Sequence, residues 1–172
     1  IYVLFKLQSF VELIYVGDNE YSAFTRLEAW KILLQIVQVN PLLGLGPANY
    51  YAYTPLFPIL GYAVSFNSHN NYIDIVAQTG VVGLAVFGWL SLSLGVMAMR
   101  VRRRALDGFS KAYMMGALAG LVASLAAAAL ADWIVPFAYN IGTRGFRSSV
   151  LFWLFMGGVL AIKRLTDEPR PG

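Results

Sequence analysis

Three long apolar stretches dominate the second half of the chain. The clearest, residues 72–99, contains one charged residue, Asp74, in its first turn. Residues 112–131 form a second apolar stretch, and residues 146–162 form a third that is short for a span. Because about 20 apolar residues cross a bilayer as a helix, the pattern predicts an all-α integral membrane protein with three transmembrane helices.

The first half of the chain is more mixed. Residues 1–16 are apolar but carry Lys6, Gln8 and Glu12, so they predict the end of a spanning helix or an interfacial helix. Residues 17–71 then predict an amphipathic helix over 22–39 and a long loop. The apolar face of that helix is expected to consist of Leu27, Trp30, Leu34 and Val37.

Polar residues suggest where these elements begin and end. Ser22 or Thr25 is the expected N-cap of the amphipathic helix, and Asn40-Pro41 ends it. The loop over 41–70 is rich in Gly, Pro, Tyr and Asn, and its aromatic residues argue against disorder. Asn71 is the expected N-cap of the 72–99 helix.

Glycines mark expected sites of close packing. Gly80, Gly83 and Gly88 would let another helix approach the first span. Gly116 and Gly120 are expected to pack in the same way on the second span.

Composition supports the membrane interpretation. Of 172 residues, 58% are hydrophobic and 13% are charged, whereas soluble domains are about 25% charged. A soluble enzyme or nucleic-acid-binding module is therefore not expected. With no cysteine and one histidine, the sequence also lacks the residues for a disulfide, a thiolate metal site or a poly-histidine site.

The distribution of charge orients the chain. Five of the 13 Lys and Arg residues lie in the 100–111 loop and three lie in the tail at 163–172. The positive-inside rule places both segments in the cytoplasm, so the region before residue 71 and the loop at 133–147 face outside. The Arg100–Arg104 cluster is thus interpreted as a topology signal and not as a nucleic-acid site.

A single histidine opens the first span in the sequence Ser68-His69-Asn70-Asn71-Tyr72. Such a histidine either orders the loop or accepts a proton, since imidazole titrates near neutral pH. Position alone leaves both roles open.

Three motifs together resemble the O-antigen ligase and polymerase superfamily. They are Arg26-x-x-x-Trp30, then Asn40-Pro41-Leu42-Leu43-Gly44-Leu45-Gly46, and finally His69-Asn70-x-Tyr72 followed by Gly80-x-x-Gly83-Leu84. Their order and their shared predicted face make the combination specific. The resemblance covers residues 22–90 well and extends to the later helices by topology only.

The resemblance implies a GT-C-like polytopic glycosyltransferase in the bacterial cytoplasmic membrane, with its active site facing the periplasm or exterior. The donor would be a glycan on undecaprenyl diphosphate, and the acceptor hydroxyl would belong to lipid A–core, another glycan or a protein. No metal, cofactor or nucleic acid is implied. Family members are usually more than twice as long and carry a further arginine upstream. The start at Ile1 is therefore interpreted as a cut within a longer protein, and this fragment alone is expected to be inactive.

The resemblance also implies catalytic roles for two residues. His69 would accept the proton of the acceptor hydroxyl, and Arg26 would bind the departing diphosphate with its planar fork. A single displacement would invert the anomeric centre.

Five further residues are candidates for substrate binding, each with a structural alternative. Trp30 could instead anchor at the membrane interface, Asn70 could cap a helix, and Tyr50 could belong to an aromatic belt. Arg144 and Arg147 face outside and could instead contact lipid headgroups. Gly44 and Gly46 are expected to shape a tight turn.

Two other functions compete with glycan transfer. A transporter or flippase of lipid-linked glycans would show internal repeats or helices broken at the bilayer midplane. A non-catalytic assembly subunit would not require Arg26, His69 and a long aromatic loop on one side.

Overall fold

The computed structural model describes residues 18–105, 108–136 and 142–167. The expected apolar segment at 1–16 lies outside this part of the chain, as do residues 168–172 of the tail. The described elements, in chain order, are α2 (Asp18–Val37), α3 (Asn49–Tyr53), η1 (Thr54–Leu56), α4 (Asn71–Arg104), α5 (Phe109–Ala127), η2 (Gly142–Gly145) and α7 (Phe146–Asp167).

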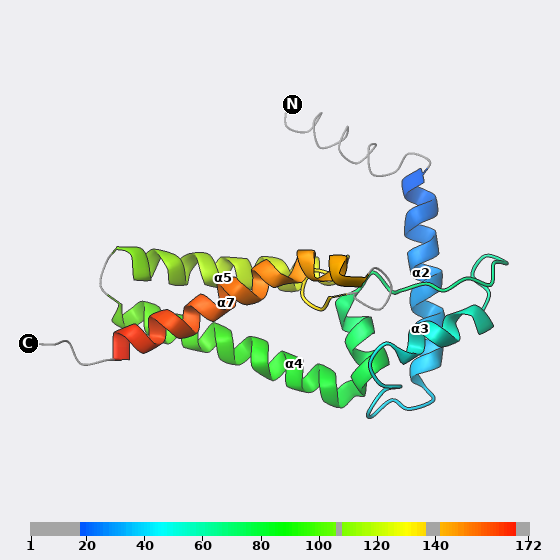
Figure 1. The fold of residues 1–172 in the computed structure, drawn as a ribbon, viewed down its shortest axis with the longest axis horizontal. Coiled ribbons are helices and arrows are strands. Elements are labelled where there is room, and N and C mark those ends of the chain that lie inside the picture. Colours follow the sequence, from blue (N-terminus) through cyan, green and yellow to red (C-terminus); the bar gives the residue numbers. More distant parts are fainter. Residues whose placement is uncertain (1–17, 106–107, 137–141, 168–172) are drawn as a thin grey trace, which may run out of the picture.

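The helices form a bundle and a layer across one end of it. The long part of α4 runs beside α5 and α7, whereas α2 lies across the end of the bundle (Figure 1). Three helices are long and apolar enough to cross a membrane: Asn71–Arg104, Phe109–Ala127 and Ser149–Asp167. The predicted all-α membrane architecture with three spans is therefore confirmed.

The spanning helices continue into charged sequence at the far end of the bundle. α4 runs through Arg102, Arg103 and Arg104 in its last turn, and α7 runs through Lys163 to Asp167. Lysine and arginine can enter a helix at a membrane boundary because their alkyl chains reach toward water. The third apolar stretch gains spanning length in this way, although its apolar core is short.

The core of the bundle is a continuous apolar cluster. Its buried members are Leu94, Ala98, Val101, Met114, Ala117, Leu121, Met156, Val159 and Ile162. The ring of Phe155 on α7 lies over Gly116 and Gly120, where added Cβ atoms would meet it at 3.7 and 3.5 Å. The predicted packing role of these two glycines is confirmed.

The buried face of α2 overlaps only in part with the predicted one. Leu33, Ile36 and Val37 pack with Tyr50 and Ala77 in a second apolar cluster. Leu27 and Leu34 are each 50% exposed, so the prediction is wrong for these two leucines, whereas it is confirmed for Val37. Both sets of positions fit a helical period, and contact with α3 and α4 selects between them.

The predicted start of this helix is also wrong. α2 begins at Asp18, so Ser22 and Thr25 lie inside it. The Thr25 hydroxyl donates to the Ser22 carbonyl at 3.0 Å, which is a bond within the helix and not a cap.

A break at Gly80 divides α4 into two parts. Gly80 has φ 66° and ψ −169°, a conformation essentially restricted to glycine. The break releases backbone groups that the loop at 41–46 then satisfies. The N–H groups of Leu45 and Gly46 donate to the carbonyls of Ala77 and Gln78 at 2.9 and 3.0 Å.

The pairing continues on the other side of the break. The N–H groups of Val81 and Val82 donate to the carbonyls of Pro41 and Leu42 at 2.9 and 3.3 Å. The loop at 41–46 is the segment that approaches Gly80. The prediction that a second helix would approach at this glycine is wrong. Around Gly88 there is open space within 4 Å.

Two glycines make the contact between loop and helix possible. A Cβ atom on Gly80 would lie 2.1 Å from the Leu42 carbonyl oxygen, and one on Gly44 would lie 2.5 Å from the Gln78 carbonyl carbon. Both obstacles are backbone atoms, which cannot rotate away as a flexible side chain can.

We expect Gly80→Ala and Gly44→Ala each to destabilise the protein by roughly 3 kcal/mol, from backbone strain and steric overlap. Gly88→Ala is the matched control on the same helix, because nothing lies within 4 Å of its added Cβ. Thermal unfolding of the intact protein in detergent measures the effect. Unchanged melting of Gly80→Ala would contradict the described break.

Candidate functional site

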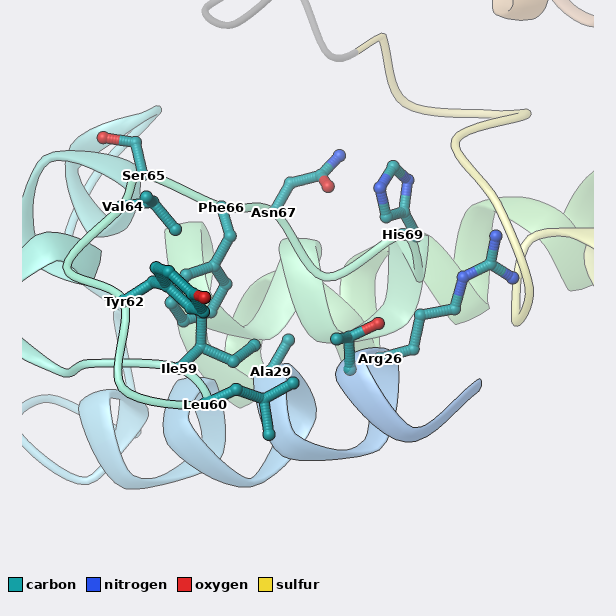
Figure 2. A pocket seen from close by; sticks show the side chains of 11 residues that line it. Arg26, Ala29, Ile59, Leu60, Tyr62, Val64, Ser65, Phe66, Asn67 and His69 are labelled. Carbon is teal, nitrogen blue, oxygen red and sulfur yellow. The ribbon is translucent and has the colours of Figure 1, made fainter. Parts of the chain in front are cut away.

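Arg26 and His69 line the same pocket, which has a volume of about 430 Å³ and lies between α2 and the loop before α4. Arg26 and His69 lie at one end of this pocket, while Ile59, Leu60 and Tyr62 lie at the other (Figure 2). The remaining lining residues are Thr25, Ala29, Val64, Ser65, Phe66 and Asn67. The pocket therefore has a cationic, polar end and an apolar end.

Each wall of the pocket comes from a distinct element. α2 contributes Arg26 on an exposed turn, and the loop contributes a two-residue turn at Leu60 and Gly61, closed by a bridge between Ile59 and Tyr62. The backbone N–H groups of Ile59 and Tyr62 donate to each other's carbonyls at 3.0 and 2.9 Å. Leu60 and Gly61 both have positive φ, as a tight turn of this kind requires.

His69 is an exposed side chain on a fixed backbone. Its φ is +48°, in the left-handed region, and its side chain is 52% exposed. The two neighbours, Ser68 and Asn70, are buried. Strained backbone of this kind persists only where the surroundings hold it in place, and it is frequent at functional sites.

Ser68 supplies much of that support. Its hydroxyl accepts the Asn70 N–H at 2.9 Å and lies 2.8 Å from a carboxylate oxygen of buried Asp74. Its carbonyl accepts the indole N–H of Trp30 at 2.6 Å. Trp30 thus uses its polar group to hold the His69 loop against α2, and the expectation that it binds substrate finds no support in this contact.

Asn70 and Asn71 both have structural roles at the start of α4. Asn70 is the N-cap of α4, and its side-chain oxygen accepts the N–H groups of Tyr72 and Ile73 at 3.0 and 3.3 Å. The side chain of Asn70 is buried and its oxygen caps the helix, so the structural alternative for this residue is observed, and its role in substrate binding stays a prediction. The cap prediction for Asn71 is wrong by one residue.

Asn71 instead joins α4 to the segment that follows α5. Its side-chain oxygen accepts the N–H groups of Ile134 and Val135 at 2.8 and 3.2 Å. Its amide donates to the Val135 carbonyl at 3.2 Å. These bonds fix the position of the neighbouring Asp132.

Asp132 is a site residue that the sequence interpretation missed. One of its carboxylate oxygens lies 3.6 Å from Nδ1 of His69, and the same oxygen accepts the Asn67 amide at 3.0 Å. The Asp132 carboxylate therefore lies within ion-pair distance of the His69 ring. The sequence did contain a signal for this residue. Asp132 is a lone acidic residue at the end of the second span, on the same predicted side of the membrane as His69.

Tyr50 is inside the protein and not on a substrate-binding surface. Its side chain is fully buried, and its hydroxyl donates to the carboxylate of Asp74. The expectation that Tyr50 stacks on a sugar ring finds no support in this position. Asp74, in the first turn of α4, is the buried acceptor that joins Tyr50 to Ser68.

Of the two later arginines, Arg147 can be placed relative to the described pocket. Arg147 is exposed on the first turn of α7 and does not line it. The backbone of Arg144 lies in η2, and its side chain is outside the described part of the chain. Among the described residues, no group of three or more His, Asp or Glu side chains is placed to hold a metal ion.

These features define a helical membrane protein with a pocket at one end of its bundle that is polar on one side and apolar on the other. A protein-family model described as O-antigen ligase matches residues 1–88, just over half of the 172 residues. The chain belongs to the O-antigen ligase family. The match contains Arg26, Trp30 and His69, but ends before Asp132. No curated protein and no solved structure matches the chain.

We expect Asn71→Ala to cost roughly 2 to 4 kcal/mol, because it leaves the N–H groups of Ile134 and Val135 without their acceptor. Asn49→Ala is the control, since Asn49 is exposed and its amide donates to the carbonyl of nearby Leu45 at 2.7 Å. Thermal unfolding in detergent compares the two variants. An equal loss of stability in the two variants would show that the Asn71 side chain does not hold the Asp132 segment against α4.

Proposed function

We propose that this chain is part of a membrane glycosyltransferase that moves a glycan from undecaprenyl diphosphate to an acceptor hydroxyl. Membership of the O-antigen ligase family supports this class of enzyme. The single observation that carries the proposal is the shared pocket of Arg26 and His69. These two residues come from different elements, and they supply the two kinds of group that the reaction requires.

The reaction forms one bond and breaks another at the anomeric carbon. The acceptor oxygen attacks that carbon, while the bond to the diphosphate oxygen breaks and the diphosphate leaves with the bonding electrons. His69 takes the proton of the acceptor hydroxyl as general base. The carboxylate of Asp132, 3.6 Å from Nδ1, stabilises the imidazolium that forms.

Arg26 acts on the leaving group. Its guanidinium stays charged and matches phosphate oxygens with two parallel donors, so it stabilises the charge that develops on the diphosphate. Exposure of Arg26 leaves the guanidinium accessible to a substrate. A single displacement inverts the configuration of the anomeric carbon. We propose no metal or cofactor in this step.

The orientation proposed for the pocket is extracytoplasmic. α4 and α7 both end in basic residues at the end of the bundle opposite Arg26 and His69. The positive-inside rule puts that basic end in the cytoplasm of a bacterial inner membrane. Lipid A–core, another glycan or a protein outside this membrane would then supply the acceptor hydroxyl.

A transporter or flippase is the second candidate, because α4 is broken at Gly80. In transporters, the backbone groups at such breaks coordinate the cargo. Here the carbonyls of Ala77 and Gln78 accept bonds from the loop at 41–46, and that loop also accepts the N–H groups of Val81 and Val82. This pairing favours a structural role for the break and supports the enzyme over the transporter.

We expect His69→Ala and Arg26→Ala each to reduce glycan transfer by about 100-fold or more while membrane insertion is retained. Transfer is measured in the intact protein as glycan gained by the acceptor, and insertion as protein level in isolated membranes. Lys31→Ala is the control on α2, because Lys31 is exposed and pairs with Glu28. Near-normal transfer by His69→Ala would overturn the proposed mechanism.

We expect Asp132→Asn to lower the rate of transfer by about tenfold, because the imidazolium at 3.6 Å loses an opposite charge. The amide oxygen can still accept the Asn67 bond, so the loop keeps its shape. The turnover number at saturating donor should fall, with little change in the donor concentration for half-maximal rate. If only the donor concentration for half-maximal rate changed, Asp132 would instead be assigned to substrate binding.

A further inference from the structure

The turn Val39–Leu43 follows α2 and contacts α4 at its break. It exposes three apolar side chains that lie close together in the sequence. Leu42 is 62% exposed and Leu43 is 65% exposed, and Val39 is exposed as well. Adjacent exposed leucine and valine side chains are typical of a surface that contacts a membrane or another protein.

The contact with α4 sets the depth of this turn in the bilayer. Pro41 and Leu42 accept the N–H groups of Val81 and Val82, the first residues after the break. The helix from Val81 to Arg100 has the length of about 20 residues that crosses the hydrocarbon. With the Arg100–Arg104 cluster at one boundary, Val81 and the bound turn lie at the other boundary.

The backbone of the turn is suited to that position. Non-helical backbone enters a membrane only where its polar groups are bonded. The N–H of Gly44 donates to the Asn40 carbonyl at 2.8 Å, and the N–H of Leu43 lies 3.3 Å from the Asn40 side-chain oxygen. Pro41 has no N–H, and its carbonyl is bonded to Val81.

The turn also continues an apolar surface of the spanning helix. Val81, Val82 and Val86 are exposed on α4 directly after the break. No charged residue lies between Lys31 and His69. The turn can therefore enter the membrane boundary without removing a charged side chain from water.

From these observations we propose that the Val39–Leu43 turn inserts Leu42 and Leu43 into the lipid at the bilayer boundary opposite the arginine cluster. The turn does not cross the membrane. It acts as an apolar anchor that holds the break in α4, and the layer that carries His69, at the membrane surface. This inference does not depend on the reaction proposed above.

The test uses nitroxide labels attached to introduced cysteines. The described chain contains no cysteine of its own that would react with the label. Leu42→Cys and Leu43→Cys are labelled separately in the intact protein, on a background without other cysteines. The protein is reconstituted in vesicles of phosphatidylethanolamine and phosphatidylglycerol. Val86→Cys on the exposed face of the span is the lipid reference, and Arg103→Cys at the basic end is the water reference.

Power saturation then measures collisions with oxygen, which concentrates in lipid, and with a water-soluble nickel chelate. The proposal predicts that oxygen collisions exceed nickel collisions several-fold at 42 and 43, as at 86 and opposite to 103. Ready collision with nickel at both positions would place the turn in water. Few collisions with either reagent would show that protein covers the turn. Either of these last two results overturns the proposal.

Discussion

The break at Gly80 is the constraint on which the rest of the structure depends. A helix that loses its own backbone bonds inside a membrane protein needs other partners for them, and here the loop at 41–46 supplies those partners. The break separates a spanning part of α4 from a first part that lies with α2 at the end of the bundle (Figure 1). Gly44 and Gly80 allow the two backbones to meet, so the motif Asn40–Gly46 has a structural explanation.

The end of the bundle is then fixed by buried polar groups. Ser68, Asn70 and Asn71 each bond to backbone that would otherwise be left unsatisfied, and Asp74 accepts from Tyr50 and Ser68. Fully bonded networks of this kind give a unique local structure. His69 benefits from that rigidity without being part of the buried network. Its imidazole is presented to the pocket from a backbone that cannot easily relax.

The pocket combines groups that the proposed chemistry uses at different moments. Its polar end holds a permanent cation, Arg26, and a titratable base, His69, with the Asp132 carboxylate behind the base. Its apolar end, with Ile59, Leu60 and Tyr62, offers a wall without charge. An amphiphilic donor, with a charged diphosphate joined to a lipid chain, has the same division. Family membership and pocket chemistry therefore support one class of substrate.

The sequence alone determined the three spans and the two residues, Arg26 and His69, that share the pocket. Spans can be read directly because the bilayer imposes a length and an apolar composition on each segment by itself. Tertiary structure decided which face of α2 is buried, that Asn70 and not Asn71 caps α4, and that Tyr50 faces inward. It also brought Asp132 to His69. These outcomes depend on partners far along the chain, and local patterns of polarity do not specify such partners.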